Sequence, residues 1–493
     1  MAVVALPTAA LSEPRCCWSA EELVGLVAEN GELRSENSKL RGENERLRGR
    51  VGELAGKVDE LRRRAKRQAA PFSRDEPKAN PARPGRRPGA EYGRKAHRSA
   101  PEEVDETLEA PLAEQCECGG EIELERIDYQ YEEELPEPQP WRRRYEIAIG
   151  RCRKCNRRHQ GRHPEQRSDA LGAAASLLGP RAVALASQLN KELGLSPQKT
   201  AKALKEFAGI SVSPGGVVQA VARQAELLEP TYEALIEGVR ASPAVAPDET
   251  GWRVEADKAW LWAFVGEELT VDAIVRGRGY EEAAAILGAD FAGVLERDGW
   301  APYRRFEQAV HQSCYGHLLK RCNELIADSI AGQARVPHAL KRILQDGLAL
   351  RDARDRGELD QRQLTDAVAA LEARIDALLA GRPSHPPNRT LLRHLRAERG
   401  NLTTFLTTPG VCATNWRAEQ ALRPAVVNRK SWGGNRSWAG AHTQEVTMSV
   451  IRTARQQGLD PVELIVQAQR APTPNISKLL RLPSRASPAE LAA

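Results

Sequence analysis

The sequence contains no apolar run that approaches the roughly 18 residues needed to cross a membrane, so we do not expect a membrane protein. It also lacks a basic segment ahead of its first apolar residues, MAVVALPTAALSEPR, so we expect no secretory signal and a cytoplasmic location. Nine cysteines in such a chain are expected to be metal ligands and core thiols rather than a disulfide scaffold. The length of 493 residues predicts about three domains.

The chain also carries little net charge, a formal +5, but this mean hides a local excess. Residues 61–98 hold 13 Lys and Arg against 3 Asp and Glu, a local +10, so the rest of the chain sums to about −5. Proline, glycine and charge prevent a packed core there, which predicts a basic flexible linker over residues 66–100. A solvated linker is the simplest interpretation. Such a segment also suits contact with the phosphates of nucleic acid, and Arg86 and Arg87 are candidates for it.

A seven-residue leucine period marks the first part of the chain. The leucines are Leu26, Leu33, Leu40, Leu47, Leu54 and Leu61, and the positions three residues earlier hold Leu23, Asn30, Asn37, Asn44, Val51 and Val58. This pattern predicts a coiled coil over residues 21–65, in which buried asparagines favour a fixed register and a two-stranded state. The alternative is a solitary surface helix, which gains little from so strict a period. We therefore expect a homodimer or a higher oligomer.

Two close pairs of cysteines lie in the next segment, residues 101–165. The first pair, Cys116 and Cys118, stands in CECGG, and the second, Cys152 and Cys155, stands in CRKC. Alternating apolar residues around 129–131 and 145–149 predict strands between the pairs. Four thiolates in two pairs are what a tetrahedral structural Zn²⁺ needs. The alternative is a set of incidental cysteines in a small β unit.

Residues 166–240 have the periodicity of helices. Within them, Ser196 and Pro197 begin one helix, Gly209 ends it, and Ser213 with Pro214 begins a second. This is the spacing of a helix–turn–helix, with glycine in the short turn. Helical hairpins of this shape also occur in protein cores, so spacing alone leaves DNA binding open. Lys199, in the first turn, is a candidate DNA contact.

From residue 241 the pattern changes to strands. Three short β-rich runs, AVAPDETGWRVEA, KAWLWAFVG and LTVDAIVRG, are followed by a helical stretch, a strand in GVLERDGW, and a fifth strand in AVHQSC. Three strands in a meander and then alternating helices and strands give the order of a ribonuclease-H-like α/β fold. We therefore predict a multidomain α+β protein with the first part of such a core at residues 241–320.

In that fold the first and fourth strands are neighbours, which brings Asp248 and Asp298 together. A third acid is needed on a later helix, and Glu419 stands there in TNWRAEQALRP. Residues 411–455 hold seven Lys and Arg against two acids, among them Arg423, Arg429 and Lys430, which are candidates for phosphate contact. Asp257 and Asp272, in contrast, are expected in turns or at exposed strand positions.

Three such carboxylates suit a two-metal mechanism. Two Mg²⁺ (or Mn²⁺) ions about 3.5–4 Å apart clamp the attacking and leaving oxygens of an in-line displacement. Hard cations of this kind take oxygen ligands, which Asp and Glu supply. Any one of these acids taken alone is more simply a solvated surface group.

Three segments then carry a resemblance to a known family. APDETGWRV, LERDGWAPYRRF with HQSCYGHLLKRCNEL, and TNWRAEQALRP with NRKSWGG and SVIRTARQQGLDP are similar to the transposases of the insertion sequence sixty-six family. These are bacterial DDE transposases with a ribonuclease-H-like core. The resemblance implies Asp248, Asp298 and Glu419 as the metal-binding triad. It also implies a CYGH motif from Cys314 to His317, which either binds metal or begins a buried helix.

The resemblance also completes the domain prediction. Residues 321–410 are expected to be an α-helical insertion, residues 411–456 the last part of the core with the third acid, and residues 457–493 a C-terminal tail. The implied function is cleavage of the ends of a mobile element and transfer of its 3′-hydroxyl strand into target DNA, by a nucleoid-associated protein that works with accessory proteins of the same element. The alternatives are a ribonuclease-H-like nuclease without strand transfer, a non-catalytic zinc and coiled-coil regulator, and an inactive domesticated copy.

Overall fold

The computed structural model describes residues 20–66, 100–166, 169, 177–255, 257–330, 332–471 and 473–483. The chain divides into two compact units, Met1–Phe72 and Ser73–Ala493, which are treated separately below. Most of the predicted basic linker, including Arg86 and Arg87, lies outside the described residues. None of the helices in the described part is both long and apolar enough to cross a membrane.

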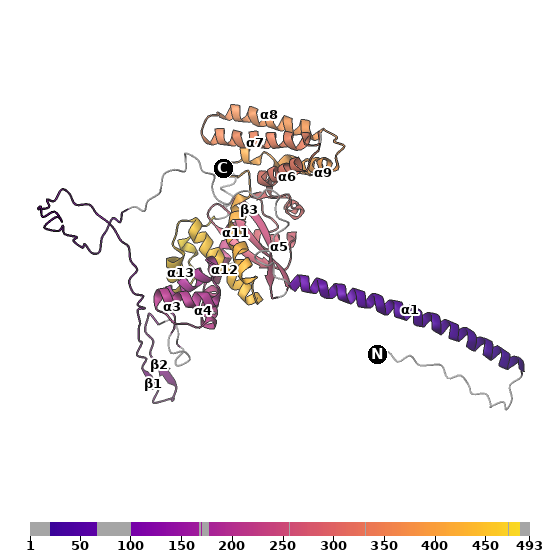
Figure 1. The fold of residues 1–493 in the computed structure, drawn as a ribbon, viewed down its shortest axis with the longest axis horizontal. Coiled ribbons are helices and arrows are strands. Elements are labelled where there is room, and N and C mark those ends of the chain that lie inside the picture. Colours follow the sequence, from indigo (N-terminus) through magenta and orange to yellow (C-terminus); the bar gives the residue numbers. More distant parts are fainter. Residues whose placement is uncertain are drawn as a thin grey trace. The chain divides into compact units, whose positions relative to one another are not determined.

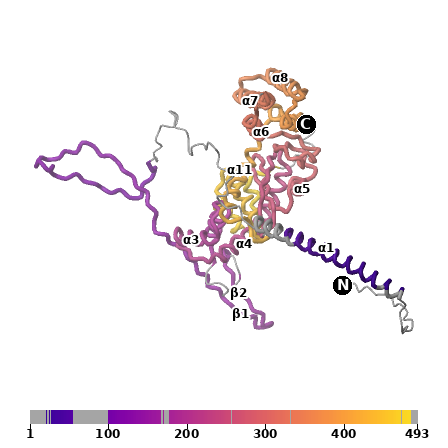
Figure 2. The backbone as a smooth tube through the Cα atoms, turned by 45° about the vertical axis from the view of Figure 1, so that its right-hand side comes forward, coloured from indigo at the N-terminus to yellow at the C-terminus, as the bar shows by residue number. Residues whose placement is uncertain are grey.

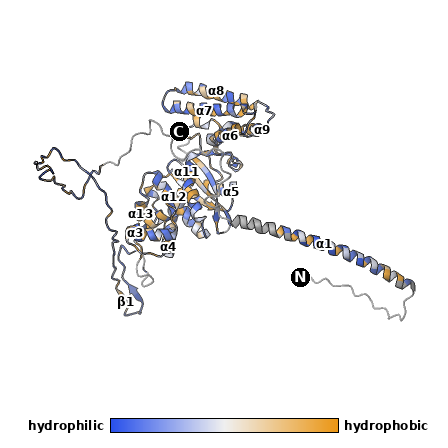
Figure 3. Cartoon of the chain, in the orientation of Figure 1, coloured by the Kyte–Doolittle hydropathy of each residue, from blue (hydrophilic) through white to orange (hydrophobic). Residues whose placement is uncertain are grey.

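The first unit contains one long helix, α1 (Ala20–Lys66), as the heptad pattern predicts. Figure 3 shows hydrophilic residues along most of α1 with hydrophobic residues recurring between them. The heptad leucines Leu33, Leu40, Leu47 and Leu54 are 52–58% exposed in the single chain. A row of half-exposed leucines on one helix is the surface that a second helix would cover. Pairing of two such helices stays a prediction.

The cysteine-containing segment has little regular structure. A short antiparallel hairpin, β1 (Ile149–Arg151) and β2 (Arg158–Gln160), encloses the second cysteine pair. The predicted strand around residues 129–131 is wrong, since no strand is assigned there in the described chain. Its apolar side chains are exposed, Tyr129 among them, so the described residues do not bury them in a core that would order a sheet.

The helical region follows the predicted capping residues. After α2 (Pro180–Ser187) and a π-helical turn, η2 (Gln188–Glu192), α3 spans Pro197–Ala208 and α4 spans Pro214–Arg240. The Ser196 and Ser213 side chains accept hydrogen bonds from the backbone of their helices, and Gly209 takes the left-handed conformation (φ 63°) that ends α3. One side of the second half of α4 packs into the main core, and one side of its first turns packs on α2 and α3.

A five-stranded mixed sheet lies at the centre of the second unit. The strands are β3 (Ala244–Val254), β4 (Asp257–Val265), β5 (Thr270–Val275), β6 (Val294–Arg297) and β7 (Val310–Ser313). Their spatial order is β5-β4-β3-β6-β7, with β5, β4 and β3 antiparallel and β3, β6 and β7 parallel. The predicted meander, and the predicted contact between the first and fourth strands, are confirmed.

Helices cover both faces of this sheet (Figure 1). One face packs on α4, α5 (Tyr280–Leu287), α12 (Trp438–Gln456) and α13 (Pro461–Arg470). The other packs on α11 (Trp416–Trp432). With thirteen α-helices and a mixed sheet in the described residues, the chain is a mixed α+β protein.

The α12 helix closes the free edge of the sheet at β5. The side chains of Glu445, Ser449 and Thr453, spaced four residues apart, accept hydrogen bonds from backbone N–H groups of β5. An edge strand otherwise leaves such groups open to pairing with another chain. The same contact corrects one prediction. Asp272, expected at an exposed position, is 1% exposed and lies 2.7 Å from the Arg452 guanidinium of α12.

Helices of the insertion form a second layer with its own core. They are α6 (Tyr315–Ala327), α7 (Arg335–Asp355), α8 (Gln361–Leu379), α9 (Pro386–Ala397) and the short α10 (Thr404–Thr407). Their apolar residues pack mainly on one another, and Figures 1 and 2 show α6, α7 and α8 stacked beyond one end of the sheet. A backbone hydrogen bond from Tyr315 N to Ala413 O joins the start and the end of the insertion.

The predicted C-terminal tail is wrong for the described residues after 457. Helix α13 buries Leu464, Ile465 and Val466 in the main core, and Ile476 and Leu480 follow it there. The apolar spacing in DPVELIVQAQ is that of an amphipathic helix, which the prediction overlooked.

Candidate active site

Asp248 lies in the middle of β3 and belongs to its α11-facing side. Side chains of a strand alternate between the two faces. Ala246 and Trp252, two and four residues away, are buried in the cluster that includes α11, whereas Val245 belongs to the cluster on the opposite face. Asp248 shares the parity of the first two residues and therefore faces the side that α11 covers.

Asp298 follows the last residue of β6 directly. The parallel ladder pairs Ala244 with Val294 and Val245 with Leu295, an offset of fifty residues, and the same offset separates Asp248 from Asp298. The two aspartates therefore stand at the same level of neighbouring strands. An oxygen of the Asp298 carboxylate accepts a hydrogen bond from the Trp300 backbone N–H at 2.9 Å, which fixes its orientation.

Glu419 lies in the first turn of α11. Ala418, Leu422 and Ala425 bury one side of this helix against the sheet. The helix start is also tied to β6, because the Arg417 guanidinium lies 3.2 Å from the buried Glu296 carboxylate. Burial raises the pKa of Glu296, and Arg417 opposes that rise. This ion pair holds the first turn, and with it Glu419, near β6, the strand that Asp298 follows.

The charges of the other two acids act on Asp248. The pKa of Asp248 is raised to about 7, chiefly by burial and then by the negative charges of Glu249, Asp298 and Glu419. Carboxylates gathered in this way disfavour one another's charged forms. A divalent cation would relieve that repulsion, and oxygen is the ligand that Mg²⁺ prefers.

The three acids lie in one region of the protein, but their carboxylates are not arranged as a complete metal-binding site in the described residues. Within the described ranges, no group of three or more His, Cys, Asp or Glu side chains is arranged to hold a metal ion. The Glu419 carboxylate is 52% exposed and lies 3.7 Å from Nε2 of His317, which is 42% exposed. The oxygen donors fit a hard cation in their chemistry, and Glu419 is the most exposed of the described contacts at this group.

The CYGH motif begins α6 beside this group. Cys314 is the N-cap residue and is buried, and its sulfur accepts a hydrogen bond from the Asn415 backbone N–H at 3.4 Å. His317 lies between this packing and the acids. A hydrogen bond with Cys314 is the largest cause that raises the pKa of His317 to about 9, and its Nε2 lies 3.7 Å from the Glu419 carboxylate. The motif thus begins a buried helix and joins the Cys314 thiol to the group of acids.

A buried network under Asp298 escaped the sequence analysis. Glu398, at the end of α9, is fully buried and accepts hydrogen bonds from Arg297, Arg304, Ser313 and Asn401. Arg297 also donates to the backbone carbonyl of Asp298 at 3.0 Å. Burial alone would raise the pKa of Glu398, but these hydrogen bonds and charges lower it to about 2.

A second network lies on the other face of β3. Glu249 accepts hydrogen bonds from Tyr303 Oη at 2.8 Å and from Arg278, whose guanidinium also lies 4.1 Å from the Trp300 ring centroid. Burial raises the pKa of Glu249, and Arg278 and Tyr303 oppose that rise. The adjacent acids Asp248 and Glu249 thus point to opposite faces of the sheet. The alternation of side chains along the strand is the sequence feature from which this difference could have been predicted.

The predicted zinc ligands occupy two tight turns. Gly119 N donates to Cys116 O at 2.7 Å, and Asn156 N donates to Cys152 O at 2.9 Å. Hydrogen bonds to the neighbouring cysteines lower the pKa of Cys116 and of Cys152, which favours the thiolates. Each pair is preformed, but the two pairs do not meet in one centre of three or more ligands among the described residues.

The basic candidates differ in their surroundings. Arg423 and Lys430 are exposed on α11, and Lys199 is exposed in the first turn of α3. Arg429 is engaged differently, because its guanidinium donates to the Gly251 carbonyl and to Thr250 of β3. It therefore joins α11 to the sheet and is less free than the other three to bind a phosphate.

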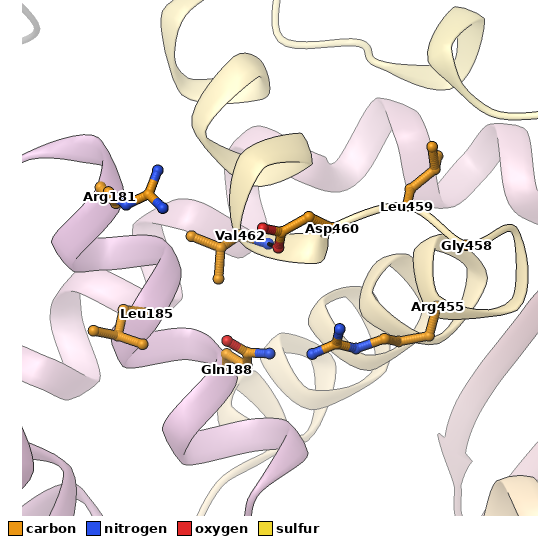
Figure 4. Close-up of a pocket in the computed structure, with 8 residues that line it drawn as sticks. All are labelled: Arg181, Leu185, Gln188, Arg455, Gly458, Leu459, Asp460 and Val462. Atoms are coloured by element: carbon orange, nitrogen blue, oxygen red, sulfur yellow. Dashed lines mark hydrogen bonds between the residues drawn. The ribbon is translucent and has the colours of Figure 1, made fainter. Parts of the chain in front are cut away.

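One cavity is lined by none of the three acids. It measures about 630 Å³ and lies among α2, α12 and α13 (Figure 4). Its two arginines, Arg181 and Arg455, are ion-paired with Glu463 and Glu192. Another cavity, of about 350 Å³, opens at Asp298 itself.

The comparison with known proteins agrees with the geometry. A family model described as "Transposase IS66 family" matches residues 175–443, a range that contains all three acids and the helical insertion. No curated protein matches the chain. The fold and the matched region define a transposase, a class of protein that acts on DNA. More specifically, the chain belongs to the IS66 family of DDE transposases, because the match covers more than half of its 493 residues.

Proposed function

We propose that this transposase cleaves the ends of a mobile insertion element and transfers the freed 3′-hydroxyl strand into target DNA. The observation that carries the proposal is the placement of Asp248 and Asp298 at one level of neighbouring strands, with Glu419 above them at the start of α11. The strand order and the positions of the acids also support a ribonuclease-H-like core.

Asp248, Asp298 and Glu419 would hold two Mg²⁺ or Mn²⁺ ions. Bound there, the ions would supply an activated oxygen nucleophile and stabilise the charge on the leaving oxygen. Asp248, which is buried and lies within reach of the charges of the other two acids, would be a ligand of these ions. Trp300 N–H and the Arg297 network keep Asp298 in place, and the Arg417–Glu296 pair keeps the α11 start in place. Glu419, half-exposed, is the ligand free to close on the site when DNA arrives.

Other parts of the chain would recognise DNA and pair the protomers. The exposed Arg423, Lys430 and Lys199 suit phosphate contact, with Arg429 as a support of α11, and Arg86 and Arg87 would add the charge of the linker. Cys116, Cys118, Cys152 and Cys155 would come together around a structural Zn²⁺. The leucine row of α1 would join two protomers, and accessory proteins of the same element would complete the assembly.

The test is incubation of the protein with labelled element ends and Mg²⁺, with accessory proteins supplied. We expect nicking at the 3′ end by the wild type and joined product with target DNA, and neither with Glu419→Ala. Asp298→Asn should bind ends normally without cutting them. An absence of 3′-end cleavage by the wild type would contradict the proposed catalytic activity.

Two alternatives are separated by the same assay. A ribonuclease-H-like nuclease without strand transfer would nick but never yield joined product. A zinc and coiled-coil regulator would bind DNA equally well with Asp248 or Asp298 replaced, and would cut none.

A further inference from the structure

The cavity beside Asp298 lies where the core meets the insertion. It measures about 350 Å³, at the small end of the about 300–1,000 Å³ of ligand pockets. The loop after β6 contributes Asp298 and Trp300, and helices α6 and α9 contribute Leu318, Arg321 and His394. The insertion therefore forms part of the wall next to a proposed catalytic carboxylate.

The walls combine an apolar floor with two aromatic rings. Leu318 is 4% exposed and Cys314 is 3% exposed. The imidazole of His394 lies so close to the loop that a Cβ built at Gly299 would come within 2.5 Å of it. A side chain at position 299 would displace this ring, whereas glycine leaves room for it. Gly299 therefore allows α9 to approach the residue that follows Asp298.

One cation in the wall is not neutralised. Arg321 makes no ion pair and no hydrogen bond with the described residues, unlike Arg297 and Arg304 nearby, which share Glu398. It stands four residues after His317, on the same side of α6, and His317 contacts Glu419. A guanidinium one helical turn from His317, in the wall of the cavity that Asp298 also lines, is placed to meet an anion that approaches the acids.

We propose that this cavity receives a single unpaired nucleotide of the DNA end, with its phosphate at Arg321 and its base among Trp300, His394 and Leu318. The inference rests on the proposed function, since the DNA end must lie at Asp298. An intact duplex cannot enter a cavity of about 350 Å³, so only a nucleotide extruded from it enters. Flat rings, an apolar floor and one cation are the groups that bind an unstacked base and its phosphate.

Capture of this nucleotide would set the register of the strand. With one base held in the cavity, the adjacent phosphodiester is fixed relative to Asp298, and cleavage is directed to one bond. The insertion would then act on the DNA end directly through Arg321 and His394, rather than serving as scaffolding alone.

The test uses element ends that carry 2-aminopurine at successive positions around the cleavage site, bound to Glu419→Ala protein so that no cutting intervenes. We expect a fluorescence rise, which reports unstacking, at one position only. Arg321→Gln and His394→Ala should abolish that rise and slow cleavage about tenfold or more in otherwise wild-type protein. Lys320→Gln, which removes a neighbouring charge of α6 outside the cavity, is the matched control and should change neither.

A second measurement removes any ambiguity from misfolding. An end that is mismatched at the captured position should bind several-fold more tightly to the wild type, because the cost of unpairing is gone, and Arg321→Gln should lose that preference. If ends are bound and cut but no position shows a rise, the cavity proposal is overturned while the transposase function stands. If wild type binds ends and shows the rise but never cuts them, the proposed function fails instead.

Discussion

Replacement of Glu398 by glutamine tests whether a buried carboxylate joins the insertion to the second acid. One Glu398 oxygen accepts from Arg304, and the other accepts from Arg297, Ser313 and Asn401. Both Glu398 and Arg297 are 0% exposed. Glutamine keeps the size of the side chain but removes the charge, so Arg297 is left buried without a counter-charge.

The magnitude follows from two independent routes. The pKa of Glu398 is lowered from 4.5 to about 2, and a fall of that size corresponds to about 3 kcal/mol of stability at neutral pH. Removal of one partner of a buried ion pair typically costs about 3–5 kcal/mol. Because the folded-state pKa is depressed, this stability is nearly complete above the unfolded pKa of about 4.5, falls to less than half at about pH 3, and is lost below about pH 2.

The assay is urea unfolding followed by far-ultraviolet circular dichroism, at pH 7 and at the lowest pH at which the protein stays folded. Glu398→Gln should be less stable by about 3 kcal/mol at pH 7, with a gap from wild type that narrows in acid. Asp376→Asn is the matched control, since it breaks the exposed pair with Arg399 and should leave the midpoint nearly unchanged. Equal stability of Glu398→Gln and wild type at pH 7, or a gap that does not depend on pH, would refute the reasoning.

Further predictions follow from other contacts. Asp248→Asn should abolish cleavage yet stabilise the metal-free protein at pH 8, measured by urea unfolding, because burial raises the pKa of Asp248 to about 7 and its charged form destabilises the fold. Thr453→Val should cost about 1–3 kcal/mol, since it leaves the buried N–H of Thr270 at the β5 edge without an acceptor. Leu40→Lys should give monomers in analytical ultracentrifugation where wild type gives dimers. Cys152→Ser should lower the zinc content of purified protein; an unchanged content would exclude Cys152 as a ligand.

The strands of the sheet, and the positions of the acids on them, were predictable because short-range sequence patterns indicate where strands begin and end. Alternating apolar residues mark strands, and turn residues separate them. The order of elements then makes β3 and β6 neighbours, so that Asp248 and Asp298 meet at a known offset. Capping residues such as Ser196 and Ser213 likewise predict where helices begin, because their side chains bond to the helix backbone.

The supporting contacts were not predictable in the same way. Glu398 and Arg297 are separated by about a hundred residues, and neither stands in a pattern that differs from an exposed charge. Asp272 was misplaced for the same reason, because its partner Arg452 lies on a helix 180 residues away. Charged residues become buried only when a distant partner is present, and a single sequence contains no record of that pairing.

The four buried residues of β6 explain how so long an insertion leaves the acids in register. The chain leaves the core at Tyr315 and returns at Ala413, and a backbone hydrogen bond joins these two residues. Glu296 then binds Arg417, just after the return, and Arg297 binds Glu398, at the end of α9. One strand thus holds both sides of the insertion immediately before Asp298. A change at either pair should therefore lower cleavage without weakening Zn²⁺ binding. Because Arg417 precedes Glu419, Arg417→Gln should affect the third acid, whereas Glu398→Gln should affect the second.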